Sequence, residues 1–398
     1  MTFVLSIIYD GREETQRKRV WYIIAAIFLI VLAGLRNGIG GDTLDYRDEF
    51  EDSSFASYTS MAEYLQDNLI SNGRMPLWSI FVTICYSISD SFYFFQFVHA
   101  IIVIIPIFYL FRKYSNYYFL CVLVYGLAGY FFLFNTEVLR ESIAIVCSIF
   151  AIHYYFKGGK SGYIRYAVLV LVGILFHASA SILLIFPLVH YIPIRRSTVF
   201  WGVFAAFILW FISDYIIEQL PTYIFLSDAS LARKISSYSE IKSNFFGFLS
   251  DSLRYICFPF FVMYYCLQNE EDSTLYAHKE HFIAFMLIIG IFAVGINGFA
   301  RINNYVALYY IIALSEFIYL YIHSPKYLFI TRTIVLLGLM YYHSLFYRAY
   351  YPSSHRYHFE YYYPYTSILD DDNSYDFRYE MHHESTEIDT SGKPSRSE

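Results

Sequence analysis

The chain has 398 residues, of which 57% are hydrophobic and only 16% are charged, whereas soluble domains carry about 25% charged residues. A soluble fold of this length would leave about a quarter of its surface exposed, so the composition excludes an ordinary water-soluble domain and indicates a membrane protein. The formal net charge of −6 lacks the basic footprint of a nucleic-acid-binding protein, so we expect no nucleic-acid partner.

The apolar residues form long continuous runs, which favour transmembrane helices over a β-barrel. The sequence therefore predicts an all-α, polytopic integral membrane protein with about 9–11 transmembrane helices. In chain order, the expected spans cover residues 20–35, 91–111, 117–134, 137–156, 197–217, 248–268, 281–299, 302–322 and 328–347. The first nine residues, MTFVLSIIY, are too short to span a bilayer.

Two apolar stretches do not fit a simple crossing. Residues 77–89 are too short, because a crossing takes about 20 residues. Residues 164–192 are long for one helix and short for two. We expect re-entrant or half-helix segments in both places.

Lysine and arginine in short loops predict the orientation. They place the loops at residues 12–19, 112–113 and 157–165 in the cytoplasm and the loop 36–75 outside. If Arg195 and Arg196 are also cytoplasmic, residues 164–192 enter the membrane and return, with His177 near the tip. That hairpin places the loop 218–247 outside, whereas a single span through 164–192 would reverse everything after it.

The composition divides the chain into two regions. Residues 1–347 form the multi-span membrane domain, with extracytoplasmic loops near 36–75 and 218–247. Residues 348–398 are polar, acidic toward the end and rich in Tyr and His, so we expect a mostly disordered tail.

The sequence offers no metal or cofactor motif. Its five cysteines all lie in apolar runs without a C-x-x-C or Cys/His ligand spacing, which is typical of small core residues. The stretch DDDNSYD at 370–376 lacks the glycine and the glutamate of an EF-hand loop. We therefore predict neither a metal nor a cofactor.

Charged residues at the ends of apolar runs are the candidates for function. Arg140 opens the helix in FNTEVLRESIAI, where Glu137 shares its predicted helical face and Glu141 follows it. It is either an arginine that extends to the interface beside a counter-ion or part of an anion site. His177, in LFHASASILLIF, is either a satisfied core residue or a functional one.

The stretch GLRNGIGGDTLDY, residues 34–46, leaves the first span abruptly. Its glycines permit positive φ and close approach to a ligand, although a flexible membrane exit is the alternative. Arg36, Asp42 and Tyr46 are its candidate residues. Arg301, in ARINNY, is either an interfacial anchor or a further cation of the same site.

On the hairpin topology, these candidates all lie in the outer half of the membrane. Several arginines without a metal cluster fit a lipid diphosphate, whose oxygens arginine forks grip. A nearby carboxylate or histidine would take the proton from an attacking sugar hydroxyl.

These motifs give the chain its resemblance to a known family. In the order GLRNGIGGDTLDY, MPLWSIF, FNTEVLRESIAI, LFHASASILLIFPL and ARINNY, it resembles the EpsG family of the Wzy-like polysaccharide polymerases over about residues 20–345. The resemblance implies a metal- and nucleotide-sugar-independent membrane glycosyltransferase of the bacterial cytoplasmic membrane. Such an enzyme joins oligosaccharide repeat units carried on polyprenyl diphosphate at the extracytoplasmic side. It also implies membrane lipids, a chain-length regulator and a flippase as partners.

Matched by motif, the resemblance suggests roles for seven residues. Arg36, Arg140 and Arg301 would bind the diphosphate, Tyr46 would shape the sugar site, and Asp42, Glu141 or His177 would assist the acceptor hydroxyl. Position 141 departs from the family, which often has glutamine there.

Two other functions remain open from the residues alone. A membrane O-acyltransferase acting on a cell-surface glycan would use His177 but would leave the arginines unexplained. A lipid-linked oligosaccharide flippase would need polar residues along a path through both leaflets, whereas the strongest ones here lie toward one side.

Overall fold

The computed structural model describes residues 1–51, 63, 75–224, 244–269, 278–296, 299–323, 329–343, 350–351 and 356–370. The chain forms two compact units. Unit 1 consists of Met1–Ala178 together with Tyr321–Glu398, and unit 2 consists of Ser179–Leu320.

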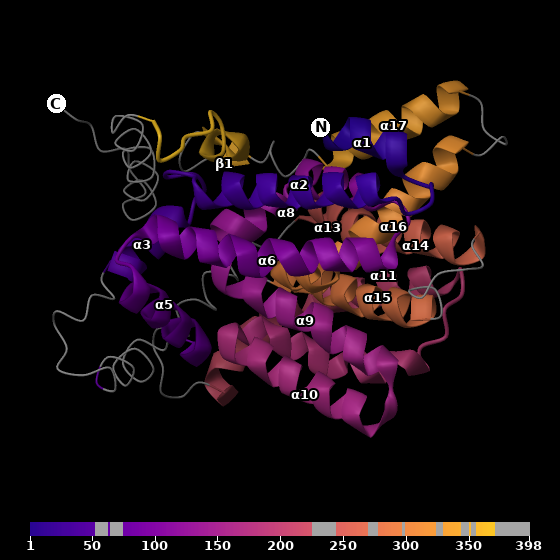
Figure 1. Ribbon diagram of the computed structural model, residues 1–398. Helices are drawn as coiled ribbons and strands as arrows, with labels where there is room; N and C mark the ends of the chain where they lie inside the picture. The colour runs from indigo at the N-terminus through magenta and orange to yellow at the C-terminus, as the bar shows by residue number, and fades with distance from the viewer. Residues whose placement is uncertain are drawn as a thin grey trace, which may run out of the picture. The chain divides into compact units, whose positions relative to one another are not determined.

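Unit 1 is built from helices and their connections (Figure 1). Its elements are α1 (Thr2–Tyr9), α2 (Gln16–Gly34), α3 (Thr43–Glu51), α5 (Pro76–Ile88), α6 (Phe92–Tyr114), α7 (Tyr118–Leu127), α8 (Tyr130–Phe132), the π-helix η3 (Leu133–Glu137), α9 (Leu139–Lys157), α10 (Gly159–Phe176), α17 (Phe329–His343), the short strands β1 (Tyr350–Tyr351) and β2 (Arg356–Tyr357), and η8 (His358–Tyr361). Helix α2 packs on α6, which also packs on α9, and α9 forms a hairpin with α10.

Unit 2 is helical throughout its described residues. Its elements are the 3₁₀-helix η4 (Ala178–Tyr191), α11 (Thr198–Ile224), α13 (Phe245–Ser252), η5 (Leu253–Cys257), α14 (Phe258–Asn269), α15 (Lys279–Gly295), η7 (Phe299–Asn303) and α16 (Asn304–His323), of which the first begins and the last ends in unit 1. Helix α15 packs on α11 and α14.

The helices confirm a polytopic all-α membrane fold. In the described residues, five helices are long and apolar enough to cross a membrane, or six if the bent pair α7 and α8–η3 is one span. We expected a larger number, about 9–11 spans. The structure also has shorter apolar helices, such as Pro76–Ile88 and Ala178–Tyr191. Helix α2 has three cations in its first turn, Arg17, Lys18 and Arg19, and is apolar from Val20 onward.

Two expected segments have a different course from a straight helix. The predicted span 117–134 bends by 83° where α7 meets α8. Gly129 lies at this bend with φ +82°, a conformation that glycine adopts without steric strain. Helix α10 begins at Gly159 instead of 164, so its 18 residues reach spanning length before the chain breaks at His177.

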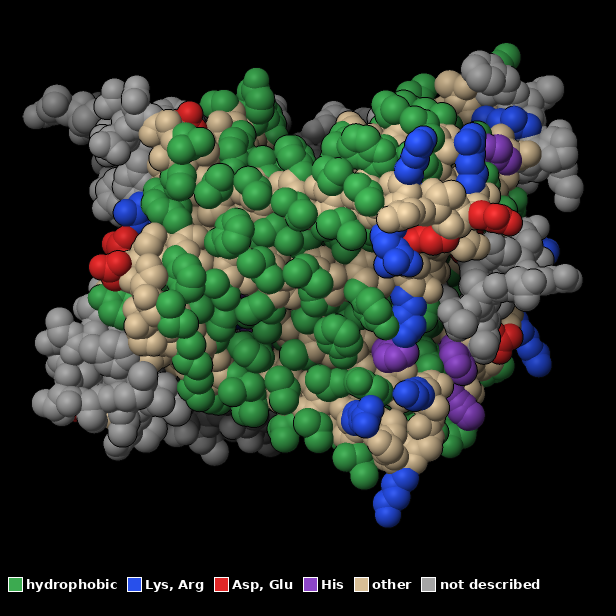
Figure 2. Space-filling view, in the orientation of Figure 1, with side chains coloured by type: hydrophobic (Ala, Val, Ile, Leu, Met, Phe, Trp, Pro, Cys, Tyr) green, Lys and Arg blue, Asp and Glu red, His purple; other side chains and the backbone are tan. Residues whose placement is uncertain are grey.

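The apolar faces of unit 1 fit a lipid solvent. Ile23, Ile27 and Phe28 of α2 are 51%, 55% and 55% exposed, and Leu171 of α10 is 57% exposed. Hydrophobic side chains cover most of the face drawn in Figure 2, while Lys and Arg gather beside them. A bilayer stabilises such a surface, whereas water would not.

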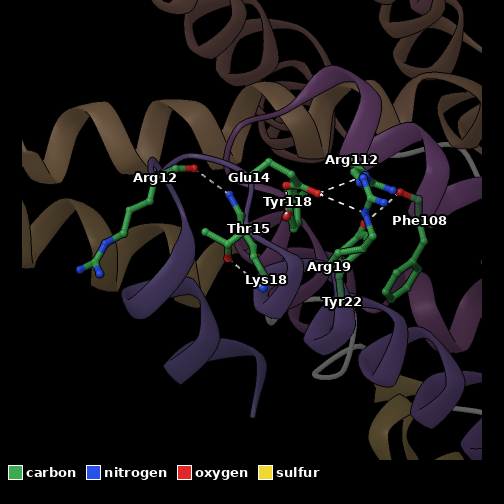
Figure 3. A network of polar contacts seen from close by, with 9 residues as sticks. All are labelled: Arg12, Glu14, Thr15, Lys18, Arg19, Tyr22, Phe108, Arg112 and Tyr118. Atoms are coloured by element: carbon green, nitrogen blue, oxygen red, sulfur yellow. Dashed lines mark hydrogen bonds and ion pairs between the residues drawn. The ribbon is translucent and has the colours of Figure 1, made fainter.

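Basic residues flanking the spans meet at one end of unit 1. Arg112, near the end of α6, lies 3.1 Å from the carboxylate of Glu14, which also accepts a hydrogen bond from the Tyr118 hydroxyl at 2.7 Å (Figure 3). Lys113 lies 3.0 Å from His153 of α9. These contacts bring the start of α2 together with the ends of α6 and α9, and we call this the basic end.

The same end includes the first turn of α2, in which Lys18 is buried. Thr15 caps the helix by accepting from the backbone N–H of Lys18 at 3.1 Å, as threonine commonly does at a helix start. The Lys18 ammonium donates to the Arg12 carbonyl at 3.1 Å, and the Tyr22 hydroxyl donates to the Phe108 carbonyl at 2.9 Å (Figure 3). The ends of α2 and α6 are thus fixed to each other.

Part of the C-terminal tail has a defined structure. We expected disorder from residue 348 onward, but residues 359–370 pack on the loop that follows α2. We call residues 359–370 the C-terminal strap. Residues 371–398, which belong to the same predicted tail, lie outside the described part of the chain.

Candidate functional site

The loop after α2 turns on glycines. Gly38 and Gly40 have φ of +62° and +103°, in the left-handed region that favours glycine. The chain then enters α3 at Thr43, which brings Asp42 and Tyr46 back toward the end of α2. The predicted abrupt membrane exit is therefore a tight, structured turn.

The segment before α9 departs from regular α-helix. The side chains of Asn135 and Thr136 each donate to a backbone carbonyl four residues earlier, at 2.8 Å in both cases. Such bonds compete with the backbone ladder, and here they lie in the π-helix η3. Val138, with φ −122° and ψ 50°, separates η3 from α9. The break turns Glu137 away from the helical position that its spacing from Arg140 predicts.

Glu137 joins this break to the loop. Its carboxylate accepts hydrogen bonds from the backbone N–H of Gly41 at 2.8 Å and of Asp42 at 3.2 Å. The approach leaves no room for side chains, because a Cβ on Gly41 would lie 3.0 Å from Glu137 Oε2 and one on Gly40 would lie 2.4 Å from Thr136 Cβ. Among the described residues, no ion pair joins Glu137 to Arg140. The loop and the start of α9 are thus packed directly against each other.

The C-terminal strap is the third segment of the chain that packs at this place. The Tyr362 hydroxyl donates to Glu137 Oε1 at 2.7 Å, and its ring packs on Phe132 with centroids 4.8 Å apart. Thr366 and Asn37 exchange two hydrogen bonds, one from the Asn37 N–H at 2.9 Å and one from the Thr366 hydroxyl at 2.6 Å. The Gly40 N–H donates to the Tyr361 carbonyl at 3.0 Å.

Arg140, in the first turn of α9, faces α3. Its guanidinium carbon lies 5.7 Å from the centroid of the Tyr46 ring, within cation–π range. Asp42 and Glu49 also act electrostatically on this guanidinium. The Trp78 indole N–H donates to Glu49 at 3.0 Å and thereby holds α5 against α3. Arg140 is half-buried, so it can meet both these side chains and a ligand.

Tyr46 is held neutral by its surroundings. Burial raises the pKa of Tyr46 to about 12, and the nearby Arg140 acts in the opposite direction. The phenol therefore stays protonated at neutral pH. Its ring packs edge-on against Trp78, with centroids 5.7 Å apart.

Arg36 occupies a different environment from Arg140. It is only 2% exposed, and Nη1 donates to the Ala33 carbonyl. Among the described residues, its Nε and Nη2 have no hydrogen-bond partner. Burial lowers the pKa of Arg36 to about 9, while Tyr365 and Glu137 act in the opposite direction. Arg36 is therefore an interior cation beneath the strap.

His99 of α6 holds the start of α9 from inside. Its Nε2 lies 3.1 Å from the Leu139 carbonyl oxygen and 3.0 Å from the Ser142 hydroxyl. The histidine is 0% exposed, so these contacts fix the turn of α9 that carries Arg140.

The structure thus brings Arg36, Asp42, Tyr46 and Arg140 into one region of unit 1. Glu141 follows Arg140 on α9 and is 1% exposed. The other two candidate residues are His177 and Arg301. His177 is half-buried and extended, with φ −156° and ψ 125°, where α10 ends. Arg301 is exposed on η7 in unit 2.

Three contributors escaped the sequence interpretation. Glu137 stood out only as a counter-ion, His99 lay inside an apolar span, and Tyr362 fell in the supposed disordered tail. Glu137 had a usable signal in the sequence. A carboxylate follows the polar residues Asn135 and Thr136, and the chain also contains a glycine-rich loop whose backbone N–H groups need acceptors. Tyr362 had no local signal, because its partner is 225 positions away.

The matched residues decide the family. Residues 19–367 match the EpsG family, which is most of the chain. The chain belongs to the EpsG family. The matched stretch of this EpsG-family protein includes the loop after α2, the start of α9 and the strap as far as Ser367. None of the curated proteins matches it, and none of the solved structures does.

The family and the apolar helices indicate the same class of protein, a membrane protein. The chain is a multi-pass membrane protein related to polysaccharide biosynthesis. In the described residues, no three His, Cys, Asp or Glu side chains are grouped as metal ligands. In the described residues, the side chains grouped at this site are an arginine, carboxylates and aromatic rings.

Proposed function

We propose that the protein is a polysaccharide polymerase of the bacterial cytoplasmic membrane. It transfers an oligosaccharide repeat unit from a polyprenyl-diphosphate donor to a lipid-linked acceptor, on the extracytoplasmic side. The observation that carries the proposal is the grouping of Arg140 with Asp42 and Tyr46 at the loop after α2, in a chain of the EpsG family.

The distribution of charge supports the extracytoplasmic side. The basic end of unit 1 gathers Arg112 and Lys113 with the first turn of α2. The loop and Glu137 lie where α2 ends and α9 begins, which is the other end of these helices. Basic loops stay in the cytoplasm, so the grouped residues face away from it.

The chemistry of the site suits a leaving diphosphate. Arg140 would bind diphosphate oxygens through its fork of N–H donors and would stabilise the charge that develops as the sugar departs. Arg301 stays a predicted diphosphate-binding residue on the strength of the motif ARINNY. Arg36 would contribute its buried positive charge from beneath the strap.

The transfer step conserves atoms and charge. The acceptor hydroxyl attacks the anomeric carbon of the donor sugar, the bond from that carbon to the diphosphate oxygen breaks, and a glycosidic bond forms. The hydroxyl proton goes to a carboxylate or histidine, with Asp42, Glu141 and His177 as the candidates. We favour Asp42, because it acts electrostatically on Arg140. Polyprenyl diphosphate leaves.

The glycans of cells carrying Arg140→Ala test the proposal. We expect lipid-linked glycans of a single repeat unit to accumulate on the outer leaflet, and long chains to disappear. Arg165→Ala is the matched control, because Arg165 also stacks on a tyrosine, 5.0 Å from the Tyr154 centroid, but lies in the cytoplasmic first half of α10. Normal long chains in Arg140→Ala cells, at normal protein amount, would contradict a polymerase, and units trapped on the inner leaflet would indicate a flippase.

A further inference from the structure

The C-terminal strap makes contacts that reach the proposed site. Tyr362 is 4% exposed, and its hydroxyl is 2.7 Å from Glu137 Oε1. The same oxygen accepts from the Gly41 N–H, while Oε2 accepts from the Asp42 N–H. The strap and the loop therefore share one carboxylate.

This sharing fixes the direction of the carboxylate. With both oxygens already accepting from the loop, Glu137 can rotate only if it loses one of those bonds or the bond from Tyr362. Hydrogen bonds to a charged group are stronger than those between neutral groups, so each donor restrains the others. The lack of space for a Cβ at Gly41 shows that the loop follows the carboxylate closely.

Asp42 and Arg140 are both connected to Glu137, the first by a hydrogen bond and the second along the chain. The backbone N–H of Asp42 is bonded to Glu137, and Arg140 lies three residues after Glu137 at the start of α9. The hydroxyl of Tyr46 also reaches the Glu137 carbonyl at 3.5 Å. A rotation of the Glu137 carboxylate would break its bond to the Asp42 N–H and would therefore let Asp42 shift relative to Arg140.

We propose that Tyr362 is a positioning residue for the transfer reaction. Its hydroxyl orients the Glu137 carboxylate, which holds the loop so that Asp42 stays beside Arg140. The inference rests on the proposed function. It makes the C-terminal strap a part of the active site, contributed by a segment far from the loop along the chain.

The test compares two tyrosines of the same strap. Tyr362→Phe removes the bond to Glu137 and keeps the ring on Phe132. Tyr365→Phe is the matched control, because the Tyr365 hydroxyl donates to the Leu32 carbonyl at 2.8 Å and not to Glu137. Both variants are made in the full chain, and rates are expressed per amount of folded protein.

Two measurements separate positioning from binding. Membrane vesicles from the producing cells, which contain their own lipid-linked repeat units, give the initial rate of polymer formation. Polyprenyl diphosphate without a sugar, titrated into the purified protein, gives the Kd for the leaving group. We expect Tyr362→Phe to lower the rate about tenfold, which corresponds to one lost hydrogen bond to a charged group, with an unchanged Kd. Tyr365→Phe should match the wild type in both.

A double-variant cycle tests the route through Glu137. Glu137→Gln replaces a pure acceptor by an amide, which loses at least one bond to the loop. If Tyr362 acts through Glu137, Tyr362→Phe should lower the rate no further in the Glu137→Gln background. If the rate of the double variant falls by the product of the two single losses, the inference is wrong. A wild-type rate for Tyr362→Phe, or an equal loss in Tyr365→Phe, would also overturn it.

Arg140→Ala in the same vesicles distinguishes the two proposals. If it abolishes polymer formation while Tyr362→Phe has the wild-type rate, only the positioning role is wrong. If Arg140→Ala vesicles make polymer at the wild-type rate, the proposed function itself is wrong.

Discussion

The guanidinium of Arg140 faces the ring of Tyr46, with its central carbon 5.7 Å from the ring centroid. Arg140 belongs to the first turn of α9, and Tyr46 to α3 after the glycine-rich loop. The contact therefore joins two of the five motifs that carry the resemblance to the EpsG family. Asp42 and Glu49 act electrostatically on the same guanidinium.

Arg140→Lys should be nearly as harmful as removal of the side chain. Lysine keeps the charge but lacks the planar fork that grips two phosphate oxygens. We expect the rate of polymer formation in membrane vesicles to fall about 10- to 100-fold, since a charge-assisted hydrogen bond contributes about 1.5–3 kcal/mol. Arg165→Lys, at the basic end, should leave the rate unchanged. A lysine variant as active as the wild type would show that charge alone suffices at position 140.

Tyr46 should not act as a base. Burial raises the pKa of Tyr46 to about 12, so its phenol loses a proton only at a pH well above the ordinary pKa of a tyrosine. The rate of polymer formation, measured from pH 6 to pH 10, should therefore have the same pH profile in Tyr46→Phe as in the wild type. An alkaline inflection present in the wild type and lost in Tyr46→Phe would contradict this role.

Gly40→Ala should destabilise the protein. The alanine would have to adopt φ +103°, and its Cβ would lie 2.4 Å from Thr136 Cβ. We expect a loss of about 1–3 kcal/mol, seen as a lower melting temperature in detergent, together with a loss of polymer. Gly126→Ala is the control, because a Cβ there meets nothing within 4 Å. Equal melting temperatures for the two variants would mean that the loop is not packed as described.

The strap and the loop after α2 should lie on the same side of the membrane. Asp45→Cys and Leu369→Cys, at exposed positions, should both react with a membrane-impermeant maleimide in intact cells. Lys160→Cys, at the exposed start of α10, should react only after permeabilisation. Opposite results for positions 45 and 369 would contradict the packing of the strap on the loop.

The sequence predicted those parts of the fold that depend on local composition. Continuous apolar runs placed α6, α9 and α16 within a few residues, because lipid solvates such runs and forces them into helices. The glycines of GLRNGIGGD predicted a tight turn, since positive φ is a local property. The break at His177 agrees with the expected half-helix, which rested on the length of residues 164–192.

Other features depend on distant contacts and gave no local signal. The bend at Gly129 lies in an unbroken apolar run, where hydropathy is insensitive to φ. The surroundings of Arg36 include the strap, because Arg36 pairs with Ser367, which is distant along the chain. The pairing of the strap with Glu137 joins residues 225 positions apart. The roles proposed for Glu141, His177 and Arg301 remain predictions.

The most direct measurement is the release of polyprenyl diphosphate by the purified protein. The protein is reconstituted in lipid with lipid-linked repeat units extracted from the producing cells, and no nucleotide sugar is added. We predict that one polyprenyl diphosphate appears for each repeat unit joined, and that Arg140→Ala abolishes both products. Failure of the wild-type protein to lengthen the glycan, or equal polymer and polyprenyl diphosphate from Arg140→Ala, would contradict the account.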